Sequence, residues 1–417
     1  MVPAASFASD STVPQQADAE SVSEVRLWAY RYVRMSELDS QIGGMMLPSE
    51  KLPAYQAHHR AKHELLRRYM DVWLPKLGYS YDRVALIDGF ASAGRYRDGK
   101  RGSPLVMLDA YVGRSAADRA RFKHPPHFIF IESKKRLVQH LKAEIDSYAT
   151  THGATVDVIH GSYEDAFPGV IDYLVGAYRQ PVPTFAFVDP RGYADNPFSH
   201  IASFKQRLPN KSEVMVYLPA SFMARFLATG ITAEALTKAY GRPTWEDAKD
   251  EQSRQLVGQR LAGLFGDRLK EHFAWVTSFN VDPERRNDYY LLFGTDHKDG
   301  LREMKRGMWK VDQHGGAAFK QAKTRPQQGQ LFSDDSVVLA PDTSILGGML
   351  QAEFGDRVFT ISQAEDFTLC RTRYLDSPHL RSWALRPLEQ TAEIEVVESS
   401  RRRRGDYPLG TTLRFTR

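Results

Sequence analysis

Five short apolar runs in the first half of the chain constrain its fold more than any other feature. Helix-length sequence separates the runs, which cover Arg83–Asp88, His127–Glu132, Thr155–His160, Thr184–Asp189 and Glu213–Leu218. Short continuous apolar runs are typical of parallel strands that are buried on both faces. Two later runs, Phe273–Phe279 and Asp288–Thr295, predict an antiparallel hairpin that closes the sheet. We therefore expect an α/β fold with a Rossmann-like, mostly parallel sheet.

The chain has 417 residues, which is too long for one ordinary hydrophobic core. Residues 1–24 are rich in Ala, Ser, Asp and Gln and are expected to form a disordered tail. Residues 25–330 are expected to form the α/β core, with an N-terminal helix before the first strand and a helical insertion near 220–268. Residues 331–417 contain three helical patterns and two strands around a basic turn, which is the outline of a small winged-helix domain.

Composition limits the functional classes. The formal net charge is +5 and the pI is about 9.0, which permits nucleic-acid binding without requiring it. The single cysteine, Cys370, excludes an intramolecular disulfide and favours a reducing compartment. The chain shows neither an apolar run of membrane-spanning length nor a secretory leader pattern, so we expect a cytoplasmic protein without membrane contact. His59 and His63 stand four apart but lack a third ligand, so we expect no metal site.

Polar and small residues follow the apolar runs in a consistent order. Because the carboxyl ends of parallel strands meet at one edge, these residues should face one ligand site. Small residues after the first run would let a ligand approach the backbone, and an acid ending the second run can accept hydrogen bonds from ribose hydroxyls. The spacing matches neither a P-loop nor the dinucleotide fingerprint, which favours S-adenosylmethionine over a nicotinamide. The expected cofactor-binding residues are Asp88, Gly89, Phe90, Gly94, Glu132 and Ser162.

The end of the fourth run carries the candidate catalytic residues. Asp189 and the carbonyl of Pro190 would accept hydrogen bonds from a target amine, and Tyr193 would stack on an extruded base. A strand-terminating turn is the alternative interpretation of the Asp-Pro pair. Arg191 would contact a phosphate or, alternatively, pair with a nearby acid.

Two basic segments are candidate nucleic-acid contacts. Arg302, Lys305, Arg306 and Lys310 recur at helical spacing and would form one basic helix face, with a solvated amphipathic face as the alternative. Arg401, Arg402, Arg403 and Arg404 would lie at the tip of the winged-helix hairpin, where they can clamp a phosphate backbone; the alternative is a solvated turn or a protein contact.

Several longer segments resemble the three-Cys-motif partner (TcmP) family. The similar segments are Ile87–Tyr96 with Gly102–Val106, Phe187–Tyr193 with Asn196–Phe198, Tyr290–Thr295 and Gly300–Lys310. The resemblance implies a methyltransferase-like Rossmann core and a partnership with a protein that bears a three-cysteine motif. Ser92 departs from the usual glycine of the first methyltransferase motif. Arg191 and Gly192 separate Asp189-Pro190 from the tyrosine of an amine-methyltransferase motif.

These observations lead to one functional hypothesis and one alternative. The hypothesis is an S-adenosylmethionine-dependent methyltransferase that acts on nucleic acid, at an exocyclic base nitrogen. The alternative is a non-catalytic nucleic-acid-binding partner of a three-cysteine-motif, radical-SAM-like protein. The sequence does not distinguish DNA from RNA, and it does not identify the base or the oligomeric state.

Overall fold

The computed structural model describes residues 46–148, 150–178, 180–190, 192–227, 233–281, 289–318 and 343–416. The expected disordered tail at 1–24 and Arg191 lie outside these ranges.

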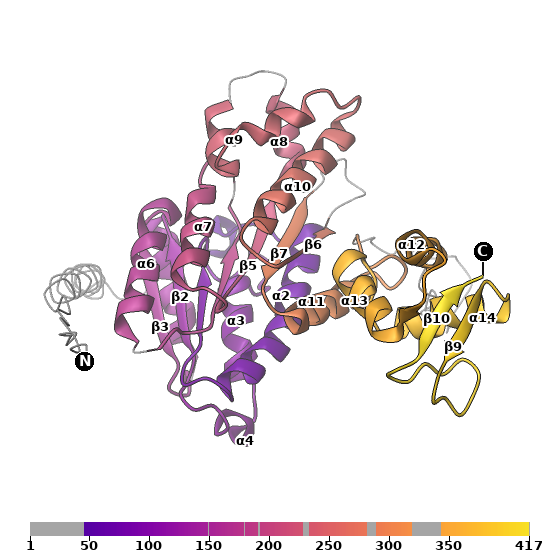
Figure 1. Ribbon diagram of the computed structural model, residues 1–417. Coiled ribbons are helices and arrows are strands. Elements are labelled where there is room, and N and C mark those ends of the chain that lie inside the picture. The colour runs from indigo at the N-terminus through magenta and orange to yellow at the C-terminus, as the bar shows by residue number, and fades with distance from the viewer. Residues whose placement is uncertain are drawn as a thin grey trace, which may run out of the picture.

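A single seven-stranded sheet forms the centre of the molecule (Figure 1), and its strand order is β3-β2-β1-β4-β5-β7-β6. The first five strands are parallel, and β7 runs antiparallel to both β5 and β6. The predicted α/β class, the mostly parallel sheet and the antiparallel closing pair are confirmed. The strands are β1 (Ala85–Asp88), β2 (His127–Glu132), β3 (Thr155–His160), β4 (Thr184–Val188), β5 (Ser212–Leu218), β6 (Trp275–Asn280) and β7 (Tyr290–Thr295).

Side chains from the central strands enter two separate cores, one on each face of the sheet. Ala85 and Ile87 of β1 enter one core, whereas Leu86 between them enters the other. This alternation explains why the strands are continuously apolar in sequence. The helices that cover the faces are α2 (Ala57–Gly78), α3 (Ser103–Val112), α5 (Lys135–Asp146), α6 (Tyr163–Ala177), α7 (Phe198–Arg207) and α11 (Lys298–Val311). Two short helical segments, η1 (Ser49–Lys51) and α4 (Ala116–Arg119), lie in connections.

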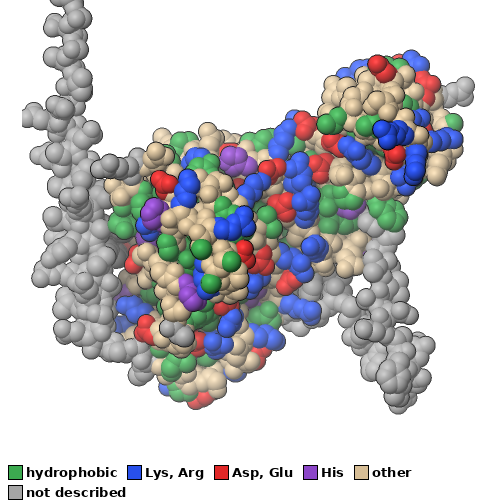
Figure 2. All heavy atoms as spheres, turned by 90° about the horizontal axis from the view of Figure 1, so that it is seen from below, with side chains coloured by type: hydrophobic (Ala, Val, Ile, Leu, Met, Phe, Trp, Pro, Cys, Tyr) green, Lys and Arg blue, Asp and Glu red, His purple; other side chains and the backbone are tan. Residues whose placement is uncertain are grey.

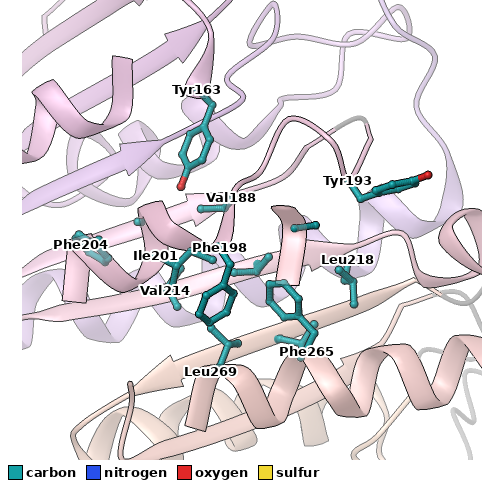
Figure 3. Packing of buried hydrophobic residues seen from close by; sticks show 14 of the residues in the cluster. Tyr163, Val188, Tyr193, Phe198, Ile201, Phe204, Val214, Leu218, Phe265 and Leu269 are labelled. Carbon is teal, nitrogen blue, oxygen red and sulfur yellow. The ribbon is translucent and has the colours of Figure 1, made fainter. Parts of the chain in front are cut away.

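The predicted insertion between β5 and β6 is helical. It contains α8 (Ala220–Leu227), α9 (Ala233–Tyr240), η2 (Pro243–Ala248) and α10 (Arg254–Lys270). Phe265 of α10 meets Phe198 of α7 edge to face, with ring centroids 5.7 Å apart (Figure 3). The insertion therefore shares the core of the sheet face on which α6 and α7 lie.

Residues 343–416 form a smaller C-terminal unit at the right of Figure 1, with its own apolar cluster. The predicted three helical segments and two strands are present, and a two-residue strand, β8, was not predicted. The small sheet has the order β8-β10-β9 and is antiparallel. The winged-helix assignment stays a prediction. The elements are α12 (Ser344–Phe354), β8 (Phe359–Thr360), α13 (Ile361–Arg371), η3 (Pro378–Leu385), α14 (Arg386–Gln390), β9 (Ile394–Glu398) and β10 (Thr412–Phe415).

None of the helices in the described ranges combines the length and the apolar character that crossing a membrane requires.

Candidate cofactor and catalytic site

The turn after β1 is held by backbone contacts to both neighbouring strands. The N–H of Gly89 donates to the carbonyl of Phe187 on β4, and the N–H of Ala91 donates to the carbonyl of Ile131 on β2, each at 2.9 Å. A Cβ on Gly89 would lie 2.6 Å from the ring of Tyr163, so only glycine fits there. Gly94 has a φ of 74°. Both glycines are therefore required by the chain itself, besides any ligand.

A pocket of about 250 Å³ opens beside this turn at the carboxyl edge of the sheet. Four of the six predicted cofactor residues line it: Gly89, Phe90, Glu132 and Ser162. The other six lining residues were not among the predicted site residues: Ile131, Ser133, Lys134, Tyr163, Glu164 and Asp195. The rings of Phe90 and Tyr163 stack with centroids 5.0 Å apart and form an apolar wall. The pocket thus combines an aromatic wall, a carboxylate and the backbone of the turn at Gly89.

Glu132 joins the first two strand ends through its carboxylate. Oε2 accepts a hydrogen bond from the N–H of Ser92 at 2.9 Å, and Oε1 accepts one from the N–H of Lys134 at 2.8 Å. Oε1 also accepts a longer hydrogen bond from the hydroxyl of Ser133 at 3.4 Å, so capacity for a ligand hydroxyl remains mainly on Oε2. Ser92 itself has a φ of 55°, a conformation that usually favours glycine. The serine therefore occupies the backbone geometry of the glycine that it replaces.

Ser162 has a structural role besides lining the pocket. It is the N-cap of α6, where its hydroxyl accepts a hydrogen bond from the N–H of Asp165 at 3.1 Å and donates to the carboxylate of Asp165. N-capping by serine typically contributes about 1 kcal/mol to helix stability. If the hydroxyl of Ser162 also contacted an adenine, it would have to do so while it keeps its hydrogen bonds to Asp165.

Asp88 lies beneath the pocket rather than in its lining. Its side chain is fully buried, and Oδ1 accepts a hydrogen bond from the N–H of Phe90 at 3.0 Å. Burial raises the pKa of Asp88 to about 7, and the nearby negative charge of Asp189 acts in the same direction. Asp88 therefore shapes the turn and responds to charge at the neighbouring strand end. The prediction that it contacts the cofactor directly is not supported by this geometry.

Asp189 follows β4 and forms an ion pair that the sequence analysis missed. Nζ of Lys62, on α2, donates to Oδ2 of Asp189, and the side chain of Lys62 is only 2% exposed. The same ammonium group lies 4.7 Å from the ring centroid of Tyr217 at the end of β5. Lys62 shares a helix face with three buried residues, Leu65, Leu66 and Tyr69. A lysine within such an apolar stripe could have indicated from the sequence that its ammonium group is buried and paired.

Histidine and tyrosine rings surround the Lys62–Asp189 pair. His58 lies 5.0 Å from Tyr289 between ring centroids, and His59 and His63 contact the ring of Tyr96 at 4.9 and 5.7 Å. Burial lowers the pKa of His59 to about 2 and that of His63 well below its ordinary value. These imidazoles are therefore neutral, which avoids adding positive charge beside Lys62. No group of three His, Cys, Asp or Glu side chains within the described residues is arranged to hold a metal ion.

Tyr193 does not present the ring face that was expected to stack on a base. Its side chain is 6% exposed, and its ring lies 6.0 Å from that of Phe222 on α8. In Figure 3 its ring lies to the right of the edge-to-face pair of Phe198 and Phe265. The stacking prediction is wrong for this conformation. Pro190 is also buried, and Arg191 lies outside the described residues.

The predicted basic face of α11 is largely a docking surface for the C-terminal unit. Nζ of Lys305 is buried and donates to the backbone carbonyls of Leu369, Thr372 and Tyr374. Arg302 donates to Asp376 at 2.8 Å. The assignment of Lys305 to a phosphate contact is therefore wrong, and Arg302 is occupied by an acid. Arg306 and Lys310 are exposed, and Arg306 pairs with Glu303.

The arginine run before β10 divides into two pairs. Arg401 donates to the buried carboxylate of Glu389 at 2.6 Å, and Arg404 donates to the backbone carbonyl of the same residue. Arg402 and Arg403 are exposed, and neither has an acidic partner within the described part of the chain. Figure 2 shows Lys and Arg side chains mixed with acidic ones on the face seen from below. Of the four arginines, only Arg402 and Arg403 are fully available to a phosphate backbone.

Comparison with known proteins gives structural matches alone. No family model and no curated protein matches the chain. The O-methyltransferase TomG from Streptomyces achromogenes, in complex with SAM, is 13% identical, with 66% of this chain and 99% of that one covered and a TM-score of 0.30. The O-methyltransferase from Bacillus cereus, in complex with SAH, is 9% identical, with 68% and 94% covered and a TM-score of 0.29. The cyclopropane synthase MmaA2 from Mycobacterium tuberculosis is 13% identical, with 54% and 81% covered and a TM-score of 0.25. The fold assignment rests on the strand order and register of the sheet.

Proposed function

We propose that this protein is an S-adenosylmethionine-dependent methyltransferase that modifies an exocyclic amine of a nucleic-acid base. One observation carries the proposal: the pocket formed by Gly89, Glu132 and Ser162 opens at the same sheet edge at which Asp189 ends the next strand. Ligands of open α/β sheets bind at this edge. The structural matches supply no part of the argument.

The pocket residues fit the adenosyl part of the cofactor. The aromatic wall of Phe90 and Tyr163 suits a flat heterocycle, and the remaining acceptor capacity on Oε2 of Glu132 suits a ribose hydroxyl. When bound, S-adenosylmethionine supplies an electrophilic methyl group on a sulfonium. In this proposal Glu132 and the turn at Gly89 hold the adenosyl part of the cofactor and thereby position the methyl group.

Asp189 would orient the acceptor. Its carboxylate accepts a hydrogen bond from the target amine and directs the nitrogen lone pair toward the methyl group. Lys62 holds one carboxylate oxygen, which restricts the rotation of the other. Positioning of this kind supplies much of the rate of a group transfer. The amine loses its proton after the new N–C bond has formed, so Asp189 need not be a strong base.

Calorimetric titration with S-adenosylmethionine and S-adenosylhomocysteine tests the cofactor part. We expect binding by the wild-type protein, and weakening of about tenfold or more in Glu132→Gln, which keeps only one carbonyl acceptor. Glu246→Ala, at an exposed ion pair away from the pocket, should bind as the wild type does. Absence of binding in folded wild-type protein would remove the methyltransferase proposal and favour the non-catalytic partner.

Transfer of a labelled methyl group to total RNA and to genomic DNA tests the substrate part. Asp189→Ala should abolish incorporation while cofactor binding persists, because Asp189 acts on the acceptor. Full incorporation by Asp189→Ala would refute the assignment. Incorporation into protein alone, with neither nucleic acid labelled, would refute the substrate class and leave the cofactor assignment intact.

A further inference from the structure

A second and larger pocket lies between the α/β core and the C-terminal unit. Its volume is about 610 Å³; Ala274 and the first residues of β6, Trp275 and Val276, form one wall, whereas α12 and α13 form the other. We refer to it as the interdomain groove. It contains none of the residues of the candidate cofactor site, so its occupant is a separate question.

The two walls of the groove are fixed relative to one another by buried contacts. Lys305 of α11 donates to carbonyls at the end of α13, and Nε1 of Trp309 donates to the carbonyl of Arg373 at 3.0 Å. Trp309 also belongs to the apolar cluster of the C-terminal unit. The groove is therefore built into the fold and does not depend on a loose contact between two units.

Strand β6 lies at the edge of the sheet beside the groove. Within the described residues its ladder partner is β7, and Asn280 at its end forms one isolated parallel bridge with Ala318. At the C-terminal end of β6, which is away from the groove residues Trp275 and Val276, the N–H of Asn280 donates to the carbonyl of Ala317 at 2.9 Å. This is the backbone hydrogen bond that the described residues show for β6 outside its pairing with β7. An edge strand presents alternate N–H and C=O groups that another extended chain can bind.

The remaining lining is apolar with a basic excess. Trp275, Phe354 and Val358 supply the apolar surface, and Val358 is 51% exposed. Four basic side chains face two acidic ones in the lining, and Lys298 is paired with Asp366. Arg357 donates only to backbone carbonyls of its own helix, and Arg371 is exposed without an acidic partner among the described residues. Two guanidinium groups thus lack a carboxylate partner, and with Glu353 as the unpaired acid of the described lining, one positive charge remains in excess.

We propose that the interdomain groove binds an extended acidic peptide of a partner protein, which adds to the edge of β6 as a further strand. The backbone of the peptide would pair with β6, its apolar side chains would contact Trp275 and Val358, and its carboxylates would meet Arg357 and Arg371. A nucleic-acid strand could bind the same arginines, but it has no peptide backbone that could pair with the N–H and C=O groups at the edge of β6. The edge therefore favours a peptide.

Cys370 gives a direct probe of occupancy. It is the only cysteine in the chain, it lines the groove, and it is partly buried. Burial raises the pKa of its thiol, so the reaction with a disulfide reagent is slow enough to follow. The test begins with short random peptides displayed on phage and selected on the full-length protein. We expect enriched sequences that alternate β-branched or aromatic residues with Asp or Glu.

A synthetic copy of an enriched peptide should slow the reaction of Cys370 severalfold. N-methylation of alternate peptide residues should weaken binding about tenfold, because it removes the N–H groups that β6 would pair. Arg357→Glu with Arg371→Glu should weaken binding by a similar factor, and Arg402→Glu should not change it. Unchanged unfolding temperatures of these surface variants show that the fold is retained.

Two outcomes would overturn the proposal. One is selected peptides that leave the reactivity of wild-type Cys370 unchanged, since they bind elsewhere. The other is protection of Cys370 by a short oligothymidylate, lost in Arg371→Glu, while no peptide protects it. That result would assign the groove to nucleic acid.

Discussion

Lys62 of α2 donates a hydrogen bond to Oδ2 of Asp189, and the two residues are 127 positions apart in the chain. The side chain of Lys62 is 2% exposed and that of Asp189 is 17% exposed, so the pair is largely removed from water. A buried ammonium group requires such a partner. The contact fixes the N-terminal half of α2 over the carboxyl edge of the sheet, where the candidate site lies.

The first prediction concerns removal of the lysine. Lys62→Met leaves the carboxylate of Asp189 without its cation, and we expect the free energy of unfolding to fall by about 3 kcal/mol. Methyl transfer should fall more steeply than cofactor binding, because Asp189 loses its fixed orientation. Chemical denaturation, calorimetry and the transfer assay measure the three quantities.

The matched control is Lys76→Met on the same helix. Lys76 pairs with Asp299, and both side chains are more than half exposed, so its loss should cost at most about 1 kcal/mol. Equal costs for the two substitutions would show that the Lys62–Asp189 pair is no more important than a surface pair.

The second prediction is a pH dependence of stability that arises at Asp88. Its pKa is raised from 3.8 to about 7, so the folded protein holds a proton there that the unfolded chain releases. The stability contributed by the protonated form is complete below about pH 4 and is lost as the pH rises toward about 7. One proton gives a slope of at most about 1.4 kcal/mol per pH unit. Relative to wild type, Asp88→Asn should therefore gain stability between pH 5 and pH 7.

Denaturant unfolding at a series of pH values gives the difference curve between the two proteins. Asp118→Asn, at a half-exposed position of α4, should run parallel to wild type over the same range. A difference curve for Asp88→Asn that is flat would mean that Asp88 is ionised in the folded protein throughout.

The third prediction follows from the left-handed backbone of Ser92. With a φ of 55°, an L-residue is strained by about 1 kcal/mol, and a β-branched one by more. We expect Ser92→Gly to be neutral or slightly stabilising, Ser92→Ala to lie close to wild type, and Ser92→Val to lose about 2 kcal/mol. The unfolding free energies of the three variants should fall in that order. A valine variant as stable as the glycine variant would contradict the assigned conformation.

The fourth prediction concerns the junction of the two units. Lys305→Met removes the donor to three carbonyls at the end of α13, at a cost of about 2 kcal/mol. We expect the C-terminal unit to detach more often, so the backbone N–H groups of α13 should exchange faster with deuterated solvent. Lys310→Met, at an exposed position of the same helix, should leave that exchange rate unchanged.

The strands were predictable because burial on both faces leaves a direct record in the sequence. The prediction Arg83–Asp88 begins two residues before β1, and His127–Glu132 matches β2 at both ends. The continuous apolar runs arise from the two cores, and the polar residues that end them mark the ligand edge. The pocket residues Gly89 and Glu132 could be named for the same reason.

Contacts between distant elements leave no such record. The partners of Lys305 are backbone carbonyls, which are present at every residue, so a basic stripe that docks on a helix end has the same sequence as one that faces solvent. Tyr193 follows a strand end as a catalytic ring would, but the insertion places Phe222 beside it. Helix α8 begins 27 residues later, and nothing near Tyr193 indicates that contact.

The last prediction separates the roles of adjacent arginines before β10. Arg401 donates to Glu389, whose carboxylate also accepts from the hydroxyl of Tyr407 at 2.8 Å, so Arg401→Ala should lower stability by about 2 kcal/mol. Arg402 and Arg403 have no such role. Their joint replacement by alanine should leave stability unchanged and weaken nucleic-acid binding.

The salt dependence identifies the contact. If Arg402 and Arg403 each neutralise one phosphate of a duplex, their loss should reduce the slope of log K against log salt by about 1.8. Fluorescence anisotropy with a labelled duplex at several salt concentrations measures that slope, and Arg414→Ala, which removes an exposed arginine paired with Glu395, is the control. Retention of both affinity and slope in the double variant would remove this turn from the nucleic-acid interface, because a phosphate contact cannot be lost without releasing fewer counterions.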